Sequence, residues 1–350
     1  MPVFRRRATL RLTRNTGVSL GVEAGVTRDE VPRLPDAYTP GQLGRSLASK
    51  VREIARLPQP SLDGGPRAFF VVGRPRFGNI RLIRLLNSHP GVLCMGEGQF
   101  FGEAAGEGAV GEQWDSLRDA LSGCRPLKTW LENSVWSKDG VAEEQLNGLI
   151  RVAMDHFRTQ KASETGKDIV GDAISFAPET IGEIVEIYPE ARVIHIIRDG
   201  RGLAQLIENH ARLVWQAEPR RASEGMFAEE DLREIATSWS VEVNEATRNG
   251  PAMLGDNHAM VRYEDLLNKP EEETKRLLEF LGAETSEETV RRCLEWISPN
   301  RSRGKRRASR DGEGLAYDWR EAFTERDKRI FKEAAGDSLI SAGYEEDHNW

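Results

Sequence analysis

The sequence predicts an α/β protein whose central, mostly parallel sheet is flanked by helices on both faces. Short apolar runs alternate along the chain with longer segments of helical spacing. Glycine and charged residues follow directly after several of these runs, which is where ligands bind in such sheets. The 350 residues are 39% hydrophobic and 30% charged, a composition that allows a sizeable folded core.

The first elements follow from local patterns. Residues 1–60 predict a partly flexible N-terminal arm, because their apolar residues show only weak periodicity, with one short helix possible at 40–57. The Pro- and Gly-rich linker at 57–66 leads into a single domain, residues 61–350. Residues 69–90 predict a strand, a tight glycine turn and a helix, and residues 92–95 predict a second buried strand.

The remaining segments continue the alternation. Residues 103–165 are interpreted as a variable insertion that shapes the acceptor side, with helical spacing at 143–160. Strands are predicted at 168–173, at 193–197 and within 258–266, where the chain leaves into a carboxylate-bearing turn. Helices are predicted at 178–188, 203–213, 231–248, 270–281, 287–296 and 324–339, the last capped by Thr324, and 298–316 is a basic loop.

Charge and cysteine content exclude several classes of function. The net charge of −7 argues against nucleic-acid binding through overall charge. Cys94, Cys124 and Cys293 are too few and too widely spaced for a disulfide framework or a zinc site, so we expect no metal and a reducing, cytoplasmic location. No apolar run approaches the roughly 18 residues that span a membrane. The Arg-rich start lacks the apolar core of a secretory signal; a transit peptide and a plain solvated arm both remain open.

The turn after the first strand has features of an anion site. Gly73 and Gly78 let the backbone approach a ligand, and Arg74 and Arg76 add positive charge. The spacing matches neither of the common nucleotide-binding glycine motifs. An ordinary strand–helix turn with two solvated arginines is the alternative.

A second basic strand end strengthens this interpretation. Arg198 and Arg201 follow the apolar run at 193–197, again where a helix begins. Two basic strand ends suit a ligand with two separated anionic groups. An ion pair of Arg198 with Asp199 or Glu208 is the alternative for that residue.

These segments together resemble the sulfotransferases that use 3′-phosphoadenosine 5′-phosphosulfate (PAPS), nearest to the bacterial and Golgi-type group. The resemblance covers about residues 68–344 and rests on "VVGRPRFGNIRLIRLLNSHPGVLCMGE", "GD…YPEARVIHIIRDGRG", "VRYEDLLNKPEEETKRLLEFLG" and the terminal "WREAFT…AGYE". It implies a P-loop-like sulfotransferase fold and PAPS as co-substrate, without a metal. It also implies sulfuryl transfer to a hydroxyl or amine of a small molecule, sugar or peptide.

The resemblance carries over to particular residues. Arg76 would stabilise the leaving oxygen, and Glu97 would be the general base, with a capping or ion-pairing carboxylate as its alternative. The implied donor-binding residues are Gly73, Arg74, Pro75, Arg76, Phe77, Gly78, Asn79 and Ile80 in the first loop, Arg198 and Arg201 in the second, and Arg303, Gly304 and Lys305 in the basic loop.

The chain also departs from the family pattern. Phe77, Asn79, Ile80 and Leu206 stand where the family carries hydroxyl residues. The alternatives are therefore a catalytically impaired binding or scaffold protein of this fold, and an enzyme with a different anionic donor. On the first hypothesis, restoring hydroxyls at Phe77, Asn79 and Ile80 together should strengthen donor binding.

Overall fold

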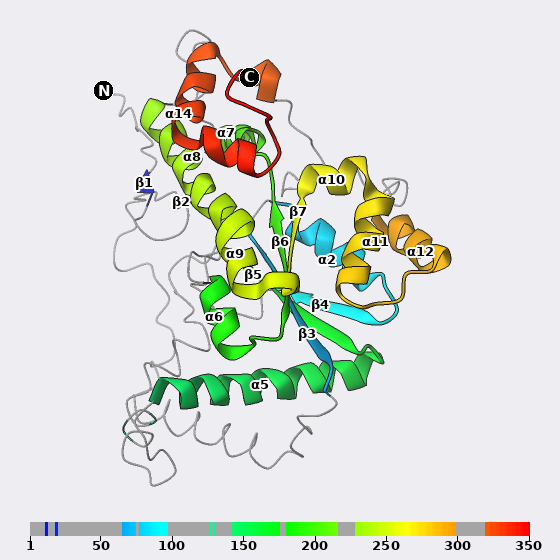
Figure 1. The fold of residues 1–350 in the computed structure, drawn as a ribbon. Helices are drawn as coiled ribbons and strands as arrows, with labels where there is room; N and C mark the ends of the chain where they lie inside the picture. The colour runs from blue at the N-terminus through cyan, green and yellow to red at the C-terminus, as the bar shows by residue number, and fades with distance from the viewer. Residues whose placement is uncertain are drawn as a thin grey trace, which may run out of the picture.

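The computed structural model describes residues 11–12, 18–19, 65–74, 77–96, 127, 129, 142–175, 180–215, 228–297 and 319–350, and its centre is a five-stranded sheet (Figure 1). The strands are β3 (Arg67–Gly73), β4 (Val92–Gly96), β5 (Ile169–Ser175), β6 (Arg192–Ile197) and β7 (His258–Arg262). Their order is β4-β5-β3-β6-β7, and every neighbouring pair is parallel, so the predicted sheet is confirmed. Earlier in the chain, β1 (Arg11–Leu12) and β2 (Val18–Ser19) pair antiparallel.

The central strand β3 shows why both faces need a helical cover. Phe69 and Val71 pack on one face and Phe70 and Val72 on the other, and all four side chains are buried. The first face is covered by α2 (Asn79–Asn87), α11 (Pro270–Phe280) and α12 (Glu287–Ile297). The second is covered by α5 (Ala142–Thr165), α6 (Thr180–Ile187) and α9 (Gly250–Leu254) (Figure 1).

A third group of buried side chains lies beyond the carboxyl end of β6. We call it the upper cluster; it joins Ile197, the last residue of β6, to Phe77, Trp239 and Phe331. Its helices are α7 (Gly200–Trp215), α8 (Glu229–Asn244), α13 (Trp319–Ala322) and α14 (Glu325–Ser341), which lie together at the top of Figure 1. Helices therefore enclose this strand end.

Some boundaries differ from the sequence prediction. The helix predicted at 231–248 is α8 only as far as Asn244; a π-helix (Glu245–Asn249) and α9 follow, and Pro251 stands in the first turn of α9. The turn predicted after β7 is instead a short helix, α10 (Tyr263–Asn268). Thr324 caps α14 as predicted, since its hydroxyl accepts from the backbone N–H of Asp327. The assignment of 61–350 to one domain stays a prediction.

Candidate functional site

Gly78 forms the sharp turn between β3 and α2. Its φ of 102° lies in the left-handed region, where only glycine is unstrained. A Cβ at this position would lie 2.1 Å from Cδ2 of Tyr263, the first residue of α10. The turn therefore needs glycine both for its backbone angle and for its contact with Tyr263.

Arg198 reaches the same tyrosine from the neighbouring strand. It follows β6 directly, is 3% exposed, and places its Cζ 4.7 Å from the centroid of the Tyr263 ring. The ends of β3, β6 and β7 thus meet at one aromatic ring, and the two basic strand ends that the sequence singled out are adjacent. Tyr263 was missed by the sequence analysis; its signal was an aromatic residue immediately after a strand end.

The N-terminus of α2 lies at this junction, because Gly78 is its cap residue. Among the described residues no side-chain capping bond is present at that position, and the first turn carries no acidic residue. The bond from Leu82 N to Gly78 O is the first that closes a helical turn. Amides before that point lack intrahelical acceptors and carry partial positive charge, which favours an anion there.

Phe77 belongs to the upper cluster by its side chain, and its predicted place in the donor-binding loop stays a prediction. Its ring is fully buried in the upper cluster, among side chains of β6, α7 and α8. An aromatic ring is stabilised by apolar contacts and has no group that binds phosphate, so it turns into the core. The ring is therefore shielded from solvent.

The two other replaced hydroxyl positions have different roles. Asn79 donates from Nδ2 to the carbonyl oxygen of Gly73 at 3.0 Å, and this hydrogen bond joins the first residue of α2 to the last residue of β3. Its Oδ1 is buried and has no hydrogen-bond partner in the part of the chain that the structure describes. Ile80 is 40% exposed on the first turn of α2.

Arg74 is held by α8. Its Nε lies 2.9 Å from Oε2 of Glu242, its Nη2 donates to the carbonyl oxygen of Ser238, and its backbone N–H donates to Oε1 of Glu242. Glu242 is fully buried, so this pair fastens the start of the loop to the helix. The guanidinium of Arg74 therefore anchors the loop to α8 in this structure, and its contact with the donor stays a prediction.

Arg201 is likewise engaged by the protein. Its guanidinium donates to both carboxylate oxygens of Asp199 and is ion-paired with Glu345. It also lies 3.8 Å from the ring centroid of Trp319 and 4.5 Å from that of Trp350, and the residue is 1% exposed. Two carboxylates and two indole rings surround the charge in this structure, and the role of Arg201 as a donor contact stays a prediction.

The other predicted site residues lie outside the described residues. They are Pro75, Arg76, Glu97, Arg303, Gly304 and Lys305. Their roles stay predictions. Arg76 lies in the two-residue gap between Arg74 and Phe77, and Glu97 is the residue after Gly96, where another described range ends.

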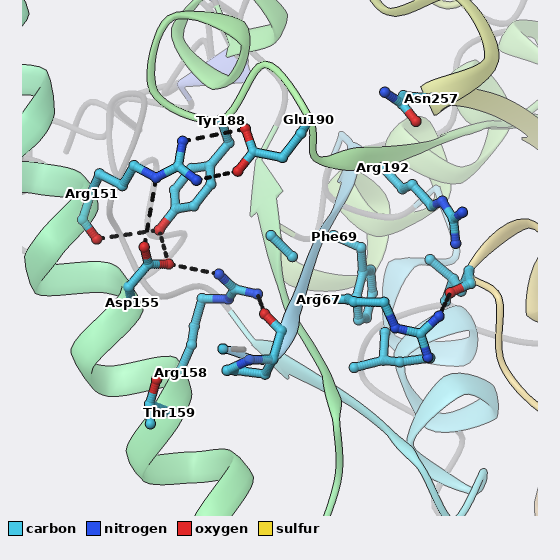
Figure 2. A pocket seen from close by; sticks show the side chains of 15 residues that line it. Arg67, Phe69, Arg151, Asp155, Arg158, Thr159, Tyr188, Glu190, Arg192 and Asn257 are labelled. Atoms are coloured by element: carbon cyan, nitrogen blue, oxygen red, sulfur yellow. Dashed lines mark hydrogen bonds and ion pairs between the residues drawn. The ribbon is translucent and has the colours of Figure 1, made fainter. Parts of the chain in front are cut away.

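A cavity of about 330 Å³ lies at the opposite, amino-terminal end of the sheet and was not predicted (Figure 2). Two of the arginines that line it form ion pairs: Arg151 pairs with Glu190, and Arg158 pairs with Asp155 at 2.8 Å. Asp155 also accepts from the hydroxyl of Tyr188, whose pKa is raised by burial and by that carboxylate. This network fastens α5 to the sheet, away from the strand ends where the two loops meet.

Two further observations concern the described residues alone. They contain no cluster of His, Cys, Asp and Glu side chains with the arrangement of a metal site. Within the same residues, no helix combines the length and the apolar character that crossing a membrane requires.

Comparison of the sequence with known proteins identifies a family. The model of the sulfotransferase family matches residues 66–287, which is more than half of the chain. A Caenorhabditis briggsae protein described as a protein-tyrosine sulfotransferase is 25% identical over 236 residues, covering 65% of this chain and 70% of that protein.

Solved sulfotransferase structures are also similar. The mouse sulfotransferase SULT7A1 complexed with PAP matches 80% of this chain and 89% of its own, with a TM-score of 0.48 and 13% identity. The sulfotransferase domain of the Synechococcus PCC 7002 olefin synthase matches 79% and 97%, with a TM-score of 0.43 and 17% identity. On the match at residues 66–287, the chain belongs to the sulfotransferase family and is an enzyme of the sulfotransferase class.

Proposed function

We propose that this enzyme transfers a sulfuryl group from PAPS to a hydroxyl or amine acceptor. The observation that carries the proposal is the meeting of the Gly78 turn and Arg198 at the ring of Tyr263. A donor that carries a 3′-phosphate and a 5′-phosphosulfate on one ribose needs two cationic or amide-rich positions close together. The ends of β3 and β6 supply such a pair on adjacent strands.

Each position has a distinct task. The uncapped amides at the start of α2 would bind the 5′-phosphosulfate, since they combine open N–H groups with the positive end of the helix dipole. Arg198, steadied on the ring of Tyr263, would bind the 3′-phosphate. Main-chain amides are present whatever the side chains are, so the amides at the start of α2 can bind the phosphosulfate without the hydroxyls that the family carries at three loop positions.

The transfer step is a displacement at sulfur. The acceptor oxygen or nitrogen forms a bond to sulfur while the bond from sulfur to the bridging phosphate oxygen breaks. The electron pair leaves with adenosine 3′,5′-bisphosphate, and the acceptor proton passes to a base. We assign the stabilisation of the leaving oxygen to Arg76 and the base to Glu97, on the family resemblance of their positions.

The acceptor is proposed at the level of chemical class. A small molecule, a sugar and a peptide all carry suitable hydroxyl or amine groups. The C. briggsae relative is described as acting on protein tyrosine, which supports a phenolic hydroxyl as one candidate.

Calorimetric titration with adenosine 3′,5′-bisphosphate tests the donor site. We expect a dissociation constant in the micromolar range or tighter. Arg198→Ala should weaken binding about 10- to 100-fold, because a hydrogen bond to a charged group contributes about 1.5–3 kcal/mol.

Arg192→Ala is the matched control. Arg192 is the first residue of β6, at the end of the strand away from Arg198. Its replacement should leave the affinity unchanged. A wild-type enzyme that binds no nucleotide at millimolar concentration would overturn the proposal and favour a different anionic donor.

A further inference from the structure

Residues 343–350, which we call the tail segment, contact the groups that hold Arg198. We propose that the tail segment braces this strand end for nucleotide binding, with Tyr344 as its principal positioning residue. The inference rests on the proposed function, because it assigns the brace to the same donor site. The family model matches residues 66–287, so the match itself does not include the tail segment.

The peptide group between Arg198 and Asp199 is fixed at both polar atoms. The carbonyl oxygen of Arg198 accepts from Nε1 of Trp239 at 2.8 Å. The N–H of Asp199 donates to Oε1 of Glu264 at 3.1 Å. A peptide plane held at both ends cannot rotate freely, so these two side chains set the direction in which the Arg198 side chain leaves the backbone.

Tyr344 contacts both of those side chains. Its hydroxyl donates to Oε2 of Glu264 at 2.9 Å, and its ring centroid lies 6.2 Å from that of Trp239. Burial, with Glu264 next in importance, raises the pKa of the Tyr344 hydroxyl, so the group keeps its proton and remains a donor. Tyr344 therefore supports the Glu264 carboxylate and the Trp239 indole together.

Glu264 also links the brace to the aromatic ring of the donor site. It follows Tyr263 in α10, and Tyr263 touches the Gly78 turn and the guanidinium of Arg198. Movement of Glu264 would move Tyr263 with it. Loss of the tail contact should therefore disturb both strand ends at once.

Arg201 gives the tail segment a second attachment. Glu345 and Trp350 enclose its guanidinium, which in turn bonds to Asp199. The carboxylate of Asp199 also accepts from the backbone N–H of Arg201 at the start of α7. The residue that sequence analysis placed in the donor site thus acts one step away, by fastening the chain on the far side of Arg198.

The test compares two tyrosines in the same chemical setting. Tyr344→Phe removes a buried hydroxyl that donates to Glu264, and Tyr188→Phe removes one that donates to Asp155 at the other end of the sheet. Wild type and both variants are titrated with adenosine 3′,5′-bisphosphate, and their sulfuryl-transfer kinetics are measured. We expect Tyr344→Phe to raise Kd and the KM for PAPS about tenfold, with kcat within twofold of wild type, and Tyr188→Phe to leave all three unchanged.

Amide hydrogen exchange without nucleotide provides a readout that does not depend on donor binding. Tyr344→Phe should speed exchange at residues 199–203 relative to wild type, and Tyr188→Phe should not. Unchanged affinity together with unchanged exchange in Tyr344→Phe would overturn the brace. Equal effects of Tyr344→Phe and Tyr188→Phe would also overturn the brace, because they would show that loss of either buried hydroxyl acts only through the overall stability of the protein. If wild type binds no nucleotide, the proposed donor falls, while unchanged exchange in Tyr344→Phe would still refute the brace.

Discussion

Phe77 should be a core residue in its energetics, although it stands in the loop expected to bind the donor. The perturbation is Phe77→Ser, which restores the residue type that the family resemblance implies. The ring is 0% exposed and packs among Ile197, Trp239 and Phe331, so its removal loses apolar burial and leaves a cavity. Truncation of a buried Phe costs about 3–5 kcal/mol, and an unpartnered buried hydroxyl adds about 1–3 kcal/mol.

The expected loss is therefore at least about 4 kcal/mol of unfolding free energy, a large share of the roughly 5–15 kcal/mol that folded domains have. Urea denaturation at 25 °C measures it. Ile80→Ser, three positions along and 40% exposed, is the matched control and should change the unfolding free energy by less than about 1 kcal/mol. Phe77→Leu keeps most of the apolar volume and should lose much less than Phe77→Ser, which keeps the measurement possible if the serine variant does not fold.

Equal costs for Phe77→Ser and Ile80→Ser would refute this reasoning, as would a serine variant within about 1 kcal/mol of wild type. The same reasoning changes the expected outcome of restoring all three hydroxyls. A combined variant that includes Phe77→Ser should unfold more easily, which masks any gain in donor affinity.

The remaining predictions concern a glycine and a buried histidine. Gly78→Ala should lower the melting temperature and weaken nucleotide binding, because its Cβ would lie 2.1 Å from the Tyr263 ring at a φ of 102°. Gly148→Ala in α5 is the control: its Cβ would meet no atom within 4 Å, so the variant should be more stable than wild type by about 0.5–1 kcal/mol. Differential scanning calorimetry measures the change in melting temperature of both variants relative to wild type. A melting temperature of Gly78→Ala equal to that of wild type would contradict the contact with Tyr263. Burial lowers the pKa of His258 to about 4, so this group is neutral when folded and takes up a proton mainly when unfolded. The unfolding free energy is therefore unaffected by this histidine above its unfolded pKa near 6.5. As the pH falls toward 4, protonation of the unfolded chain lowers the unfolding free energy, by about 2 kcal/mol at pH 5. His258→Asn should show a shallower loss of stability between pH 7 and pH 5 in urea titrations, while His348→Asn, at an exposed position, should follow wild type. Parallel pH profiles for wild type and His258→Asn would count against the buried neutral histidine.

Much of the fold could be predicted because it depends on short-range patterns. The apolar run around Phe70 has β3's length and composition, and strands that alternate with helices favour a parallel arrangement. Thr324 could be recognised as a cap because capping involves residues three positions apart. The interruption near Pro251 and the helix at Tyr263 were missed, since sequence patterns locate element boundaries less well than element types.

The place of the candidate site could be predicted from the order of residues alone, because glycine and arginine follow two apolar strands and parallel pairing brings both strand ends to the same edge of the sheet. Tertiary structure decided which side chains can serve a ligand there. Arg74 is held by a carboxylate 168 positions away, and Arg201 by one 144 positions away. Phe77 turns inward because distant helices offer it an apolar environment. The direction of a side chain is set by partners that only folding brings near, so residue type at a strand end can indicate a binding site without showing which residues face the ligand.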